Sequence, residues 1–379
     1  ADVPPADVDT DVGPDVVVPG SQQVAPAFFL AVMVVAVLVL VGLLVRRHLR
    51  ARRGSVRRRP IGVSAALAVV VLAGAAAWLT RPPPFFVPEL GALPTLMPAD
   101  NVFRRTATDL PVSADSGRWI GSISDLELSA GFGGRVVDGV VWGIPYNFVD
   151  DATVRRPVAI RLEPRSSFPG PYPITDPAYI ESMPTYGFDM HYVGIDPERS
   201  EVWELLSTRA WFGRWEADSG AHYSTRTNAY PVGSTIAAGL PLLPGTITYD
   251  EVAAGDVDHV VLAAIETTAT GSWIWPARGT DGRSTVPEAP PQGAWLRLRE
   301  TADLSALGPQ ATVVADALRT HGLILSDTGP GFALRGTPDR RWDDDDLATL
   351  RTLHASDFEV VDPSGIVVDP EQLAVRPPA

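Results

Sequence analysis

The sequence of 379 residues contains no cysteine and no lysine. Without cysteine the chain has no disulfide, no thiolate ligand for zinc and no thiol nucleophile. Without lysine, Schiff-base and lysine-base chemistry are excluded. The sequence also lacks the strong catalytic signatures, since it has no P-loop, no Gly-x-Ser-x-Gly elbow and no His-Glu-x-x-His motif. These absences leave open whether the protein is an enzyme.

Basic side chains are fewer than acidic ones. The basic residues number 31, against 45 Asp and Glu, which gives a formal net charge of −14. Proteins bind nucleic acid mainly by neutralising its phosphates, so this balance argues against a nucleic-acid partner. No cofactor-binding motif is present, and we expect no cofactor.

Two apolar runs without charge, residues 24–45 and 61–79, lie near the N-terminus. Each has about the 20 residues that a helix needs to cross a bilayer. The arginine-rich loop between them, residues 46–59, is expected to stay cytoplasmic. The pattern predicts a two-pass plasma-membrane protein with both termini extracytoplasmic and membrane lipids as partners. The second run also resembles a cleavable export signal, but a complete first span favours an uncleaved hairpin.

The remaining segments differ in composition. Short apolar runs bounded by Gly, Pro, Asn and Asp indicate β-structure after the hairpin, and a helical spacing of apolar residues follows near the C-terminus. We expect an extracytoplasmic, mainly-β domain, a sandwich or barrel-like fold, with a C-terminal α/β subdomain. The predicted divisions are a mobile acidic segment (1–22), a transmembrane hairpin (23–80), a Pro-rich spacer (81–98), the β-rich domain (99–300) and the α/β subdomain (301–379).

Several strands can be placed within residues 99–300. Asp138-Gly139 predicts a hairpin turn between 136–137 and 140–143, with residues 144–149 prolonging the second strand. A second hairpin joins 191–195 to 201–206, and both runs alternate as half-buried strands should. Further strands are predicted at 157–162, 258–267, 273–275 and 295–298.

The C-terminal segment predicts two helices around a hairpin. Residues 309–321 have apolar residues at helical spacing and stop at Gly322. Residues 323–326 and 332–335 then form the predicted hairpin. The four aspartates 343–346 are interpreted as the N-terminal cap of a second helix through Leu353 rather than as a metal site, because acids there complement the helix dipole. We predict no metal site.

Polar residues at strand ends are the candidate catalytic groups. Asp189 and His191 share one strand face, because side chains alternate with a period of two. Together with Glu251, His259 and Arg278, they would suit acid–base chemistry on a polar substrate. Taken singly, each histidine is equally consistent with a satisfied core or rim position.

Aromatic residues in the same region are the candidate ligand-binding groups. Trp211, Trp215 and Trp275 could stack against sugar rings, with Asp250 accepting hydrogen bonds from the sugar hydroxyls. The alternative interpretation is that tryptophan fills a β core.

Several motifs occur together in the exported part of the chain: residues 168–174, 189–191, 238–245, 249–255 with His259, 275–278 and 336–342. In their order and spacing they resemble a family of exported bacterial proteins of unassigned activity. The resemblance covers residues 98–362 and implies a single exported domain with the C-terminal α/β part integral to it. Relatives usually carry Arg before the strand histidine, where this chain has Met190.

Two functions are consistent with these observations. The aromatic and acidic groups indicate a membrane-anchored domain that acts on or binds cell-envelope glycans. The alternative is an accessory subunit of a larger membrane complex, with other membrane subunits as partners and no catalytic role, because two helices exceed what tethering requires.

Overall fold

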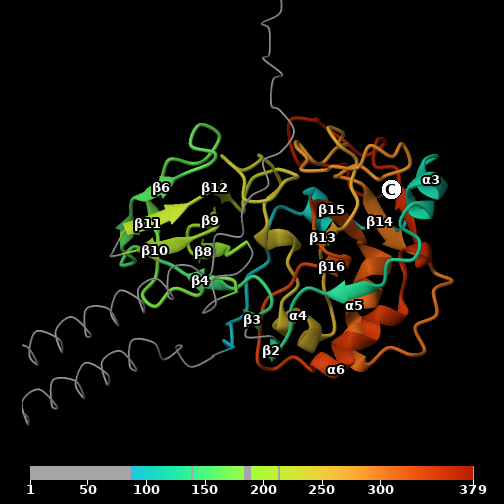
Figure 1. The fold of residues 1–379 in the computed structure, drawn as a ribbon, viewed down its shortest axis with the longest axis horizontal. Helices are drawn as coiled ribbons and strands as arrows, with labels where there is room; N and C mark the ends of the chain where they lie inside the picture. The colour runs from blue at the N-terminus through green and yellow to red at the C-terminus, as the bar shows by residue number, and fades with distance from the viewer. Residues whose placement is uncertain (1–86, 138–139, 183–188, 212–213, 379) are drawn as a thin grey trace, which may run out of the picture. The chain divides into compact units, whose positions relative to one another are not determined.

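Two large sheets dominate the described part of the chain, and three small sheets accompany them (Figure 1). The computed structural model describes residues 87–137, 140–182, 189–211 and 214–378. These residues belong to one unit, Pro83–Ala379, and the fold is mainly β.

The larger sheet has six strands in the order β1-β16-β13-β15-β14-β17. Strand β1 runs parallel to β16 and β13 parallel to β15, and the other neighbours are antiparallel. Its strands are β1 (Leu128–Ala130), β13 (Val261–Ile265), β14 (Trp295–Leu298), β15 (Leu323–Thr328), β16 (Phe332–Leu334) and β17 (Phe358–Val361).

The second sheet has four strands in the order β12-β9-β8-β4. They are β4 (Tyr146–Phe148), β8 (Tyr192–Asp196), β9 (Glu201–Leu206) and β12 (Ser219–Ser224). The small sheets pair β10 (Arg209–Trp211) with β11 (Arg214–Ala217) and β6 (Val158–Ile160), β2 (Val136–Val137) with β3 (Val140–Val141), and β5 (Arg155–Arg156) with β7 (Tyr172–Pro173).

The helices are short. They are α3 (Ser116–Gly121), α4 (Tyr249–Ala254), α5 (Pro309–Thr320) and α6 (Asp344–Leu347), with 3-10 turns η1 (Val102–Arg104), η2 (Leu243–Gly245), η3 (Ala348–Thr352) and η4 (Ala355–Asp357). The predicted helix at 309–321 is confirmed as α5, and Gly322 follows it with a φ of 74°. The predicted cap is also confirmed, because the Asp343 side chain accepts hydrogen bonds from the amides of Asp345 and Asp346.

Both faces of the six-stranded sheet are buried. Alternate residues of each strand point to opposite faces, and residues of both faces belong to buried clusters. In β13, Val261 and Ala263 pack in the same cluster as helix α5, whereas Leu262 belongs to a second cluster. The second cluster also contains Val193 of β8 and Val202 of β9. It therefore fills the space between the two large sheets.

The four-stranded sheet is covered on its other face too. Tyr192, Trp203 and Leu205 point into a third cluster, where they pack with Val158 of β6. Because both faces are covered, β8 is buried along its whole length. The half-buried alternation predicted for residues 191–195 and 201–206 is therefore wrong, although the hairpin that joins them is confirmed.

The strands of the C-terminal segment lie within the six-stranded sheet. Strands β15, β16 and β17 share one sheet with β1, β13 and β14. The predicted hairpin of 323–326 with 332–335 is wrong, because β13 lies between β15 and β16 and pairs with both. The predicted hairpin around Asp138-Gly139 is confirmed, because β2 pairs with β3. Residues 146–148, however, do not prolong its second strand but join the four-stranded sheet. The strand predicted at 273–275 is reduced to an isolated bridge.

The membrane prediction also needs correction. Nowhere in the described ranges is a helix both long and apolar enough to cross a bilayer. The two-helix hairpin and the two-pass plasma-membrane location are therefore not supported. The apolar runs on which they rested, residues 24–45 and 61–79, and the acidic segment 1–22 lie outside the described residues.

Candidate functional site

A pocket of about 800 Å³ opens where the ends of the two large sheets meet. Its wall is residues 230–239, a segment without regular strands, and it is completed by residues 278–281 and by the end of β15. A loop before β7 contributes Glu163, Ser166 and Ser167. The volume lies in the range of small-molecule sites.

One cross-strand row forms part of the pocket lining. Ser219 of β12 pairs with Leu206 of β9, and the β8–β9 register places His191 opposite Leu206. Residues opposite one another share a sheet face, so all three side chains point to the same side. All three line the pocket.

A β-bulge places an acidic residue on the opposite wall. Between β13 and β15 the register shifts at Ala263/Ala264, so that Ala264 pairs with Asp327 and Ser326 is the extra residue. Without the bulge, alternation would direct Asp327 toward the cluster under α5. With it, Asp327 shares the face of Ile324, which packs in the cluster between the sheets, and lines the pocket.

His191 is held at both of its ring nitrogens. Nδ1 lies 2.6 Å from Glu181 and Nε2 lies 3.1 Å from the Thr235 carbonyl oxygen, and the residue is 1 % exposed. Since both partners accept, the ring donates from both nitrogens and is protonated. Burial alone would lower the pKa of His191, but the charge of Glu181 and the hydrogen bond to it outweigh burial and raise the pKa to about 9.

This pair predicts a specific pH dependence of stability. The pKa of His191 is raised from 6.5 to about 9, so its contribution is complete below pH 6.5 and is lost as the pH rises toward 9. The pKa of Glu181 is lowered, so its contribution is lost as the pH falls below 4.5. We expect the free energy of unfolding to fall by up to about 3 kcal/mol between pH 6.5 and 9 through His191. Urea titrations of wild type and His191→Gln should converge across this interval; a constant difference would contradict the assignment.

Glu204 fixes the pocket wall from inside the four-stranded sheet. It is fully buried, and its Oε1 accepts from the Tyr223 hydroxyl (2.6 Å) and from the amides of Leu242 and Leu243 (3.0 and 3.2 Å). Its Oε2 accepts from the Thr235 hydroxyl at 2.8 Å. Burial raises the pKa of Glu204, and these donors oppose the rise. Thr235 thus connects Glu204 to His191, and residues 230–239 are held against the sheet.

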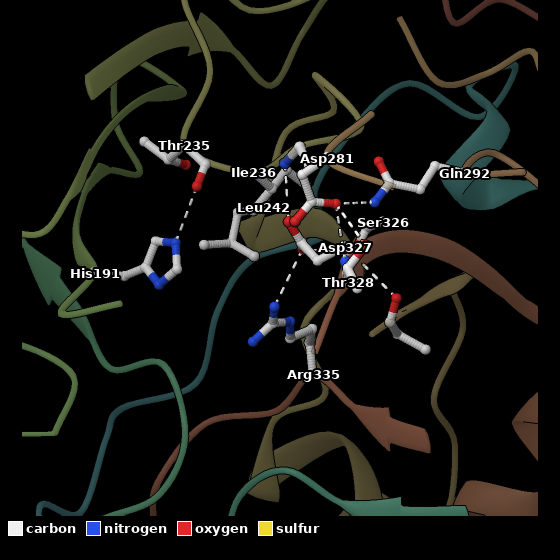
Figure 2. Close-up of polar contacts among 12 residues, drawn as sticks. His191, Thr235, Ile236, Leu242, Asp281, Gln292, Ser326, Asp327, Thr328 and Arg335 are labelled. Atoms are coloured by element: carbon white, nitrogen blue, oxygen red, sulfur yellow. Dashed lines mark hydrogen bonds and ion pairs between the residues drawn. The ribbon is translucent and has the colours of Figure 1, made fainter. Parts of the chain in front are cut away.

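The other end of the wall is held by β15. Asp327 accepts from the Ala237 amide at 2.8 Å and pairs with Arg335 at 3.1 Å (Figure 2). Beside it, Oδ1 of Asp281 accepts from the amide (3.1 Å) and hydroxyl (2.8 Å) of Thr328, and from Gln292 (Figure 2). The pocket wall is therefore ordered before any ligand arrives.

The candidate catalytic residues divide between two places. Asp189, His191 and Arg278 line the pocket. Glu251 and His259 form a separate pair at helix α4, with 3.3 Å between Oε1 and Nε2, and neither lines the pocket. The sequence placed these residues at neighbouring strand ends, but residues 249–254 are helical, and this turns Glu251 toward His259.

Three of the candidate ligand-binding residues, Asp250, Trp215 and Trp275, do not line the pocket. Asp250 pairs with Arg341 at 2.7 Å, and the indole of Trp275 donates to the Gln372 carbonyl oxygen at 3.2 Å. Trp215 packs against the third cluster. Trp211 belongs to β10, and its side chain lies outside the described residues.

Four residues that shape the pocket were not found from sequence: Glu181, Glu204, Asp281 and Asp327. A signal existed for Glu204, which is the only charged residue in the run 202–206 and alternates with Val202 and Leu206 on one face. No comparable signal reveals Asp327, because its orientation depends on the bulge. Comparison of the chain with protein-family models, curated proteins and solved structures finds no match.

Proposed function

We propose that this pocket binds a hydroxyl-rich ligand of the saccharide class. The observation that supports it is the lining, in which serine and threonine hydroxyls and carboxylates surround a cavity of about 800 Å³. Carboxylates accept hydrogen bonds from sugar hydroxyls, and serine and threonine hydroxyls can donate or accept. Their fixed placement lowers the entropic cost of binding.

Two titratable residues of the pocket, His191 and Asp327, are already engaged with protein groups. General acid–base catalysis needs a group that can exchange a proton with the ligand. Both nitrogens of His191 are engaged, and both oxygens of Asp327 accept hydrogen bonds, from Ala237 on one side and from Ser326 and Arg335 on the other. These two residues are therefore held in structural contacts, and the proposal concerns binding of the ligand.

Recognition in this pocket relies on hydrogen bonds rather than on stacking. Tyr230 is the aromatic residue among the described lining residues, and the Arg278 guanidinium lies 4.6 Å from its ring centroid. The accessory-subunit alternative rested on apolar runs outside the described residues and gains no support from the site.

Ser219→Ala tests the proposal. Ser219 is 5 % exposed and lines the pocket, and its hydroxyl has no hydrogen-bond partner among the described residues. Its removal should leave folding unchanged but lower ligand affinity about three- to tenfold, the value of one neutral hydrogen bond. We would screen trisaccharides of glucose, mannose, galactose, glucosamine and N-acetylglucosamine by saturation-transfer NMR on the full chain, then measure affinities by calorimetry.

The matched control is Ser364→Ala, which removes an exposed serine outside the pocket. It should bind as the wild type does. Absence of binding to every saccharide, or equal affinities of Ser219→Ala and wild type, would refute the proposal.

A further inference from the structure

Three solvent-exposed carboxylates of the pocket make no ion pair within the described part of the chain. Glu163, Asp189 and Asp281 all line it, and none of them makes an ion pair with another described residue. Glu163 accepts only from the Ser166 hydroxyl, and Asp281 uses a single oxygen for its hydrogen bonds. The neighbouring residues 183–188, which lie outside the described ranges, include no charged side chain in the sequence.

The positive groups of the pocket are already neutralised. His191 lies 2.6 Å from Glu181, and Arg278 lies 2.6 Å from Glu371. Neither glutamate lines the pocket. Asp327 in turn is matched by Arg335. What remains is an excess of negative charge in a concave site, where the surrounding low-dielectric walls concentrate the field.

A second feature indicates a ligand independently of charge. Ser219 is 5 % exposed and lines the pocket, and its hydroxyl has no hydrogen-bond partner among the described residues. This oxygen is not one of the enclosed unsatisfied atoms of the described residues, so it opens into the pocket and can bond a ligand atom there. It lies in the same row as His191, which sets it beside the acidic groups rather than on a distant surface.

We infer that the ligand carries a protonated amine, as an amino sugar does. The inference rests on the proposed function and adds the charge of the ligand to it. A cation complements these carboxylates, which make no ion pair with a described residue, whereas a neutral sugar does not. The sugar hydroxyls then meet Ser219 and the serine and threonine hydroxyls of the wall.

A metal ion fits the site less well. Glu163, Asp189 and Asp281 come from three separate segments, and no group of three or more His, Asp or Glu residues in the described ranges is arranged to hold a metal. Metal ligands must converge on one point. Carboxylates spread around a cavity suit an extended organic cation.

The test compares three β-1,4-linked trisaccharides that differ at one substituent: the glucosamine, N-acetylglucosamine and glucose trimers. Calorimetry with the full chain near pH 6, where the amine is protonated, should show the glucosamine trimer binding at least tenfold more tightly than either neutral trimer. The ratio should approach one in the double variant Asp189→Asn/Asp281→Asn and in high salt, because both remove the charge attraction. Asp256→Asn, an exposed aspartate outside the pocket, is the matched control and should keep the ratio.

Each failure has a distinct result. Equal affinity for the three trimers overturns the inference and leaves saccharide binding intact. Ethanolamine binding as tightly as the glucosamine trimer overturns the proposed function and leaves the preference for an amine. Binding of calcium alone, or of none of these probes, overturns both.

Discussion

A Glu204→Leu variant is expected to lose about 4 kcal/mol of unfolding free energy and all measurable ligand binding. Leucine fills a similar volume but leaves four buried donors without an acceptor, namely the hydroxyls of Tyr223 and Thr235 and the amides of Leu242 and Leu243. Each buried donor left unsatisfied costs about 1–3 kcal/mol, so relaxation of one or two still leaves a large loss. Urea unfolding followed by tryptophan fluorescence would measure the change.

Glu204→Gln separates the loss of charge from the loss of acceptors. The amide oxygen can keep the three donors that Oε1 accepts, and the amide nitrogen can donate to the Thr235 hydroxyl, which rotates to accept. We expect a loss of only about 1 kcal/mol and retained ligand binding. Similar destabilisation by leucine and glutamine would show that the hydrogen bonds are not the source of the stability.

Sequence patterns predicted local elements better than long-range pairing. The hairpin of β8 and β9 and the cap at Asp343 each depend on a few adjacent residues. The pairing of β13 with both β15 and β16 joins residues that are roughly 60 to 70 positions apart, which no local pattern encodes. The turn at residues 327–331 predicts a reversal of the chain, but a reversal does not decide which strand becomes the neighbour.

The site was predicted only in part, for a similar reason. Asp189 and His191 were found because two polar residues at period-two spacing precede an apolar strand. The sequence also predicts Glu251 and His259 in this site, because residues 249–251 resemble the end of a strand, whereas they begin helix α4. Its capping box, formed by Thr248 and Glu251, was a local signal that could have identified the helix.

Asp327→Ala, which removes the acidic partner of the Asp327–Arg335 ion pair, should lower the free energy of unfolding by about 3–5 kcal/mol. Only 13 % of the Asp327 side chain and 17 % of the Arg335 side chain are exposed, and the Nε of Arg335 has no partner among the described residues. Asp327→Ala therefore leaves a largely buried cation without an ion pair, although the charges of Glu181 and Asp189 still act on it, and also removes the acceptor of the Ala237 amide. Arg335→Met leaves Asp327 with two donors, Ala237 and Ser326, and should cost less.

The double variant Asp327→Ala/Arg335→Met shows which loss destabilises the protein more: the ion pair between Asp327 and Arg335, or the hydrogen bond from the Ala237 amide to Asp327. If the stranded charge dominates, the double variant should be more stable than Asp327→Ala alone, with a coupling free energy of about 1.5 kcal/mol or more. Strict additivity in urea titrations would contradict this. Ligand binding gives an independent measure. Both variants that lack Asp327 lose the hydrogen bond from the Ala237 amide, whereas Arg335→Met keeps it. Only Arg335→Met should therefore bind the ligand with nearly wild-type affinity.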